Sequence, residues 1–241
     1  MTIALGFLCP DGIVLCADRQ MTDSQSGLKY QKRKISYMTG MFAGVRFTLA
    51  SAYAGDPEAA KIMRTEIRER LGEEIAKSRA IGFQSPMARK ALDKIFSNKH
   101  AKHLQMLIGI RFYSGEVCLF KISGRKVMDA ESEYIGSGDS SALRYLADVL
   151  LVSPRVHNVH EAGVLGAYLV SVANRYVDGC SGGPDVIIIP SADGTISQSY
   201  RVFPNHKERF AYCEDQVGQG LRELLFSGGT KALEIVNPKP A

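Results

Sequence analysis

The first apolar runs of the chain predict a β-hairpin. Residues 2–8 are strand-like, 10–12 form the turn signal Pro-Asp-Gly, and 13–17 are a second apolar run. A tight turn sets a register in which Ile3 lies opposite Asp18. The start of the chain therefore comes close to a carboxylate.

Two amphipathic helices are predicted next. Asp56 is suited to cap a helix with Pro57 in its first turn, and Ser85-Pro86 repeats this pattern. Apolar residues then recur at helical spacing: Met63, Ile67, Leu71 and Ile75 in the first helix, and Ala88, Ala91, Leu92 and Ile95 in the second. We expect the two helices to form a pair.

The remaining pattern alternates short strands with helices. Strands are predicted at 104–111, 116–122, 134–135, 185–189 and 195–199, and helices at 140–152, 159–177 and 207–226. Short-looped strands between helix pairs do not make a parallel βαβ sheet. The order favours an α+β fold, a sandwich of two antiparallel sheets between helix pairs, with residues 1–241 as a single domain.

Composition narrows the class of protein. With 45% apolar and 23% charged residues, the chain is neither disordered nor collagenous. Its five cysteines include no C-x-x-C pair, which argues against a disulfide framework and a zinc ribbon. No apolar run approaches the roughly 20 residues of a membrane helix, and no signal-peptide pattern opens the chain. We therefore expect a cytoplasmic protein with no membrane partner.

The net charge of +5 comes from one region. Residues 57–103 carry 11 Lys or Arg against 6 Asp or Glu. Glu66 with Arg70 and Glu73 with Lys77 have the spacing of helix-surface ion pairs. The pattern favours a solvated helix face over a basic docking surface, and no nucleic-acid partner is expected.

Common cofactor motifs are absent. There is no G-x-x-x-x-G-K-[ST], H-E-x-x-H or G-x-S-x-G. The glycine-rich segment 136–139 lacks the third glycine of a dinucleotide loop. His157 and His160 are better explained by the start of a helix than by metal ligation. No cofactor and no metal are expected.

Thr2 is the residue with the most distinctive chemistry. Methionine before a small residue is normally removed, so the mature chain would begin with threonine and a free α-amine of pKa about 7.7 to 8.0. A hydroxyl beside such an amine is a nucleophile and a base in one residue. The simpler interpretation is that Thr2 only starts an edge strand.

Asp18 and Lys34 favour the catalytic interpretation. Asp18 ends an apolar strand, where a bare carboxylate would be unfavourable, and Lys34 lies in a segment that can return to the same edge. A carboxylate would keep this lysine charged and fixed. The ammonium would favour loss of the threonine proton and lower the pKa of the amine.

At these residues the sequence resembles the proteasome β-type and HslV-like threonine peptidases, which are N-terminal-nucleophile hydrolases. The segment 2–22, TIALGFLCPDGIVLCADRQMT, resembles the opening of that family, and KRKI at 32–35 resembles its lysine segment. AGD at 54–56, GSGDSSALRYL from 136 and DGCSGGPDVIII from 178 resemble three further motifs. The resemblance covers nearly the whole chain and suggests a bacterial proteasome homologue.

The resemblance implies an αββα fold and a role for each matched residue. Thr2 would be the nucleophile, Lys34 would tune its amine, and Asp18 would hold Lys34. Ser137, Asp178 and Ser181 would hold the α-amine and its water, and the Ala52 amide would donate to the oxyanion. Met21, Lys32 and Ala54 would line the substrate pocket. Helix capping and loop turns are the simpler explanations for the three residues around the amine.

The resemblance also implies partners. Polypeptides would be the substrates, homo-oligomeric rings of six or seven subunits would stack, and an ATPase would unfold substrates. Two alternatives stay open: a catalytically silent ring or scaffold subunit, and an amide hydrolase of small molecules. The intact residue set argues against the first, and the motifs argue against the second.

Overall fold

The computed structural model describes residues 2–22, 26–42, 45–77, 84–97, 104–136, 158–177, 179–192 and 197–199. Its contacts divide the chain into two compact units, 1–200 and 201–241. All described residues lie in the first unit. The expectation of a single domain stays a prediction.

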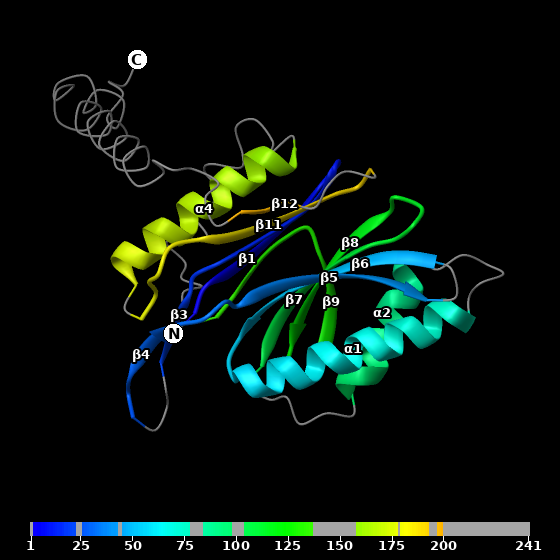
Figure 1. Cartoon of the computed structure of the whole chain (residues 1–241), viewed down its shortest axis with the longest axis horizontal. Coiled ribbons are helices and arrows are strands. Elements are labelled where there is room, and N and C mark those ends of the chain that lie inside the picture. The colour runs from blue at the N-terminus through cyan, green and yellow to red at the C-terminus, as the bar shows by residue number, and fades with distance from the viewer. Residues whose placement is uncertain are drawn as a thin grey trace, which may run out of the picture. The chain divides into compact units, whose positions relative to one another are not determined.

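Two five-stranded sheets form the centre of the first unit (Figure 1). The first has the order β10 (Ser132–Ile135), β1 (Ala4–Cys9), β2 (Gly12–Ala17), β11 (Asp185–Pro190) and β12 (Ser197–Ser199). The second has the order β5 (Ile35–Phe42), β6 (Val45–Ala54), β7 (Gln105–Arg111), β8 (Val117–Ser123) and β9 (Lys126–Ala130). All these pairs are antiparallel, as is the short ribbon of β3 (Gln20–Thr22) and β4 (Lys29–Gln31).

A buried core of small and branched residues joins the two sheets. It includes Ala4, Ile13, Leu15 and Ala17 of the first sheet and Ala50, Ala52, Leu107 and Leu119 of the second. Small side chains let two sheets approach closely, and the alternation along each strand leaves the other face for helices. On β6 that other face carries Phe47, Leu49 and Tyr53.

Two helices cover the outer face of the second sheet (Figure 1). They are α1 (Pro57–Lys77) and α2 (Ser85–Ser97). Asp56 Oδ1 accepts a hydrogen bond from Glu58 N at 2.9 Å, which satisfies a free amide of the first turn of α1. Every residue of the two predicted apolar stripes is buried in this core. The predicted helix pair is confirmed.

A third described helix, α4 (Val159–Tyr176), packs on the other sheet against β1, β2 and β11 (Figure 1). Asn158 caps it by accepting hydrogen bonds from His160 N and Glu161 N, both at 3.0 Å. The mixed α/β character with antiparallel sheets is therefore confirmed. The predicted helices at 140–152 and 207–226 lie outside the described residues.

Gly166 of α4 permits close contact with the first sheet. A Cβ at this position would overlap Cys16 Sγ and lie 3.2 Å from the Phe7 ring, whereas one at Gly163 would come no nearer than 3.2 Å to Ile188. We expect Gly166→Ala to lower the free energy of unfolding by about 1 to 3 kcal/mol. Gly163→Ala gains the same helix propensity, about 1 kcal/mol, but brings its Cβ into a tight contact with the end of the Ile188 side chain, so the net effect should be small. Urea unfolding of both variants checks this, and equal effects would contradict it.

Several strands were not predicted. No strand was predicted at β3, β4, β5, β6 or β9. β5 is an edge strand with exposed Tyr37 and Met41. Its pairing with β6, and not an apolar pattern in its own sequence, makes this segment a strand.

The surface ion pairs also differ from the prediction. Arg70 Nη1 lies 3.2 Å from Glu73 Oε2, and Lys77 Nζ lies 3.3 Å from Glu74 Oε1. The predicted pair of Glu73 with Lys77 is wrong because each residue has a partner three positions away. Exposed pairs of this kind contribute little to stability.

Candidate active site

The β1–β2 hairpin places the start of the chain beside Asp18. Its register pairs Ala4 with Ala17, and Asp18 N donates to Ile3 O at 3.1 Å. In return, Ile3 N donates to Asp18 Oδ1 at 2.9 Å. The predicted position of Ile3 opposite Asp18 is confirmed.

Lys34 brings a positive charge to the same point. It immediately precedes β5, and its carbonyl oxygen accepts a hydrogen bond from Tyr53 N of β6 at 3.2 Å. Lys34 Nζ lies 2.8 Å from Asp18 Oδ1 and 2.9 Å from Asp18 Oδ2. Neither side chain has any exposed surface. The structure therefore joins Asp18 and Lys34 in a buried ion pair next to residue 3.

The donors around Asp18 explain how a charged pair is accommodated in the interior. Besides Lys34 Nζ, its oxygens accept from Ile3 N and from Gln20 N, the latter at 3.1 Å. Burial raises the pKa of the Asp18 carboxyl, and Lys34 and these amides oppose that effect. Burial lowers the pKa of the Lys34 ammonium, which Asp18 opposes. Each charge thus depends on its partner.

Thr2 lies against the backbone of Gly136. Thr2 is only 8% exposed. Gly136 has a φ of 94°, and a Cβ at this position would overlap the Thr2 carbonyl oxygen and lie 3.2 Å from Ala54 Cβ. Gly136 N donates to Gln105 Oε1 of β7 at 2.7 Å. Only glycine fits this position without displacing Thr2.

The loop before β11 is bonded to the residues that follow Asp18. Ser181 O accepts from Arg19 N at 3.1 Å and from Gln20 N at 3.0 Å. The Ser181 hydroxyl donates to Gln20 Oε1. Ser181 is therefore connected to Asp18 through Gln20, whose backbone N–H bonds to both residues. The other two residues expected around the amine, Ser137 and Asp178, lie outside the described residues.

An ion pair not foreseen from the sequence fixes the same loop. Arg19 Nε donates to Asp185 Oδ1 at 2.9 Å, and Arg19 Nη2 contacts the same oxygen. Asp185 is buried at the start of β11, next to Ala17 of β2. The only signal for this pair, and for Gln20, is a polar run directly after an apolar strand.

Cys180 lies beside the Asp18–Lys34 pair. Burial raises the pKa of its thiol to about 11, the Asp18 charge adds to this, and Lys34 opposes it. Near neutral pH the group is therefore a thiol and not the thiolate that a cysteine nucleophile requires. The four described cysteines are free and buried.

The positions expected at the oxyanion and substrate sites are distributed over two strands, β3 and β6, and a loop. Ala52 lies within β6, opposite Ile35 on one side and Leu107 on the other, and Ala54 ends the same strand. Met21 is buried in β3, whereas Lys32 is exposed and donates its N–H to Arg19 O at 2.9 Å. Their roles stay predictions.

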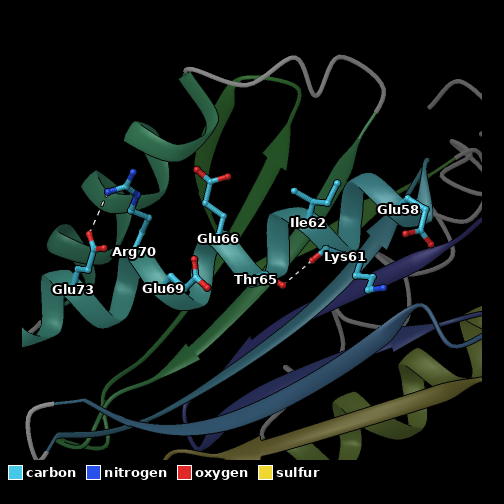
Figure 2. Close-up of a pocket in the computed structure, with 8 residues that line it drawn as sticks. All are labelled: Glu58, Lys61, Ile62, Thr65, Glu66, Glu69, Arg70 and Glu73. Atoms are coloured by element: carbon cyan, nitrogen blue, oxygen red, sulfur yellow. Dashed lines mark hydrogen bonds and ion pairs between the residues drawn. The ribbon is translucent and has the colours of Figure 1, made fainter.

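One hollow in the described surface lies elsewhere, on α1. It has a volume of about 520 Å³ and is lined by Glu58, Lys61, Ile62, Thr65, Glu66, Glu69, Arg70 and Glu73 (Figure 2). A second hollow, of about 660 Å³, lies between α1 and α2. Both are lined mainly by charged side chains, and neither includes Thr2 or Lys34.

The described residues contain no group of three or more His, Cys, Asp or Glu side chains arranged to hold a metal ion. Among the helices that the structure describes, none is long and apolar enough to cross a membrane.

The fold and the buried cluster together define an antiparallel two-sheet α/β protein in which Thr2 lies one residue from a buried Asp–Lys pair. Comparison with solved structures makes the fold more specific. A Gly-1 mutant of Anbu from Hyphomicrobium sp. strain MC1 matches with a TM-score of 0.70 and 17% identity, over 92% of this chain and 97% of that one. Anbu from the same strain gives 0.65 at 17% identity and the same coverage.

Anbu from Yersinia bercovieri, described as an ancestral beta-subunit, matches with a TM-score of 0.64 and 15% identity, over 99% of this chain and 98% of that one. No family model and no curated protein matches the sequence. At these identities the likeness shows the fold alone, and that fold is the one seen in Anbu.

These comparisons correct the family inferred from the motifs. The assignment to proteasome β-type and HslV-like threonine peptidases is wrong, because no family model matches the sequence and the three solved structures described above are Anbu. The motifs misled for a physical reason. An Asp-Gly turn and a small-residue approach to a helix are required by the hairpin and helix geometry, whatever the family.

Proposed function

We propose that the chain is a threonine-type endopeptidase with an Anbu-like, proteasome-related fold and Thr2 as its nucleophile. The observation that carries this proposal is the buried pair of Lys34 Nζ with both oxygens of Asp18, at 2.8 and 2.9 Å, bonded directly to the residue after Thr2.

Stability alone is a weak reason for such a pair. Replacing a buried ion pair by well-packed apolar residues is often neutral or stabilising by about 1 to 4 kcal/mol. The surrounding interface is apolar, so aliphatic side chains would suit it. A fixed positive charge beside Thr2 has a chemical use instead, because it stabilises the alkoxide that forms when the hydroxyl loses its proton.

The mechanism follows from these groups. In the mature chain, Thr2 Oγ attacks the peptide carbonyl carbon while its proton moves to the neutral α-amine, directly or through a water. The tetrahedral intermediate expels the new peptide amine, which takes up that proton and leaves an ester on Thr2 Oγ. Water, deprotonated by the α-amine, then hydrolyses the ester and restores the hydroxyl.

The remaining predicted residues have supporting roles in this proposal. Ser137, Asp178 and Ser181 hold the α-amine and its water. The Ala52 amide donates to the oxyanion. Met21, Lys32 and Ala54 line the substrate pocket.

The wider organisation belongs to the same proposal. The chain forms one αββα domain of the N-terminal-nucleophile type. Copies assemble into stacked rings of six or seven subunits in the cytoplasm, and an ATPase delivers unfolded polypeptides. Native mass spectrometry measures the ring size.

The deciding experiment is intact-mass analysis after incubation with a peptide epoxyketone. The reagent reacts with a hydroxyl and a free α-amine on the same residue, so we expect one adduct on chains shown to begin at Thr2. Thr2→Ser keeps both groups and should also react, whereas Thr2→Ala should not. No adduct on a threonine-initiated chain would overturn the proposal and favour a silent scaffold subunit.

A further inference from the structure

Gln20 is a buried polar residue that the proposed mechanism does not use. It is 6% exposed, and it begins β3 two residues after Asp18. Its side-chain Oε1 accepts the Ser181 hydroxyl, and its Nε2 has no hydrogen-bond partner within the described part of the chain. Burying an amide nitrogen without a partner is unfavourable, so stability does not explain the presence of glutamine at this position.

The contacts of Gln20 connect the two halves of the site. Its backbone N–H is shared between Asp18 Oδ2 at 3.1 Å and Ser181 O at 3.0 Å. Its side chain contacts the hydroxyl of the same serine. Gln20 is therefore bonded both to the carboxylate that holds Lys34 and to the serine proposed to hold the α-amine.

The direction of the Ser181 hydroxyl bond matters for the amine. A serine hydroxyl has one hydrogen and two lone pairs. With its hydrogen directed to Gln20, Ser181 Oγ can only accept from any further partner. It would then accept an N–H of the α-amine and leave the amine lone pair free for the Thr2 hydroxyl.

We propose that Gln20 is a positioning residue that fixes the Ser181 hydroxyl as an acceptor for the α-amine of Thr2. This inference rests on the proposed function. The charged and titratable groups around this position among the described residues are Asp18, Lys34, the Cys180 thiol and the Arg19–Asp185 pair. All of them are unchanged in the variants below.

Removing the Gln20 oxygen that accepts the Ser181 hydroxyl should change the pKa of the α-amine. In Gln20→Met the side chain keeps its length but Ser181 Oγ is free to donate to the amine, which favours the neutral form. We expect the pKa of the α-amine to fall by roughly 0.5 to 1 pH unit. The acidic limb of the kcat/KM profile should move down with it, and kcat should fall about tenfold because the lone pair is misdirected.

A double-mutant cycle separates this role from a purely structural one, in which Gln20 only holds the loop that contains Ser181. If Gln20 acts through Ser181, then Gln20→Met should change the amine pKa no further in a Ser181→Ala background. Gln20→Glu keeps an acceptor for the hydroxyl and adds a negative charge, so it should raise the amine pKa. If Gln20→Met does not fold, Gln20→Glu decides the matter. Its charge raises the amine pKa in any background, so a larger rise with Ser181 present than in the Ser181→Ala background supports a role through the hydroxyl, and equal rises would overturn it.

The readout must not depend on activity. Competitive acylation of the α-amine across pH, followed by mass spectrometry of the N-terminal peptide, measures its pKa in chains shown to begin at Thr2. Unchanged amine pKa values, with only a lowered melting temperature, would overturn the positioning role. If the pKa values change as expected but wild type forms no epoxyketone adduct, the positioning role stands and the peptidase proposal fails.

Discussion

Replacing Lys34 by methionine is expected to abolish peptide hydrolysis and to lower the free energy of unfolding by about 3 to 5 kcal/mol. Asp18 would keep its bonds from Ile3 N and Gln20 N but lose the ammonium that contacts both its oxygens. An uncompensated carboxylate with no exposed surface is strongly unfavourable. A fluorogenic peptide assay and urea unfolding measure the two effects.

Two further variants separate charge from packing. Lys34→Met combined with Asp18→Leu removes both charges, so most of the lost stability should return while hydrolysis stays absent. Lys121→Met removes another lysine, whose Nζ lies 2.6 Å from Glu133 Oε2. Because Glu133 is 30% exposed, water can replace its partner, and we expect a small loss of stability and unchanged activity. Hydrolysis by the double variant would contradict the role given to Lys34.

The sequence is most informative where a pattern is local. The hairpin could be predicted because a Pro-Asp-Gly turn sets its register, and that register brings Ile3 opposite Asp18. The α1 stripe could be predicted because Met63, Ile67 and Leu71 repeat at helical spacing and cover one sheet. In both segments the residues that decide the structure are neighbours along the chain.

Non-local contacts explain what the sequence did not predict. β6 contains Ala50, Ala52 and Ala54, and alanine has a low intrinsic preference for strands. These residues form a strand because both neighbours, β5 and β7, pair with it and the facing sheet leaves room only for small side chains. Nothing in the sequence of β6 itself indicates that a second sheet packs against it.

The candidate site shows the same division. Asp18 and Lys34 could be expected to meet because a charged residue after an apolar strand needs a partner. The Gln20–Ser181 bond joins residues 161 positions apart, and the Arg19–Asp185 pair joins residues 166 apart. Pairs at such separations depend on the packing of β11 beside β2, which becomes visible only in the fold.

Gly136→Ala is expected to lower kcat/KM by about a hundredfold or more without changing any group that takes part in the chemistry. The new Cβ would overlap Thr2 O and lie 2.9 Å from Thr2 C, and both are backbone atoms that cannot rotate away. Thr2 must therefore shift. Its α-amine and hydroxyl would shift with it, away from Lys34 and Ser181.

A matched glycine separates this displacement from backbone strain. Gly27 also has a positive φ, 69°, but a Cβ there meets nothing within 4 Å. Both substitutions introduce the strain of an alanine in the left-handed conformation, about 1 to 2 kcal/mol. Only Gly136→Ala also moves Thr2. Rates of peptide hydrolysis and of epoxyketone adduct formation should therefore fall in Gly136→Ala and stay near wild type in Gly27→Ala. Equal rates in the two variants would mean that the contact with Gly136 does not position the nucleophile. The hydrogen bonds between Ile3 and Asp18 would then have to position Thr2 alone.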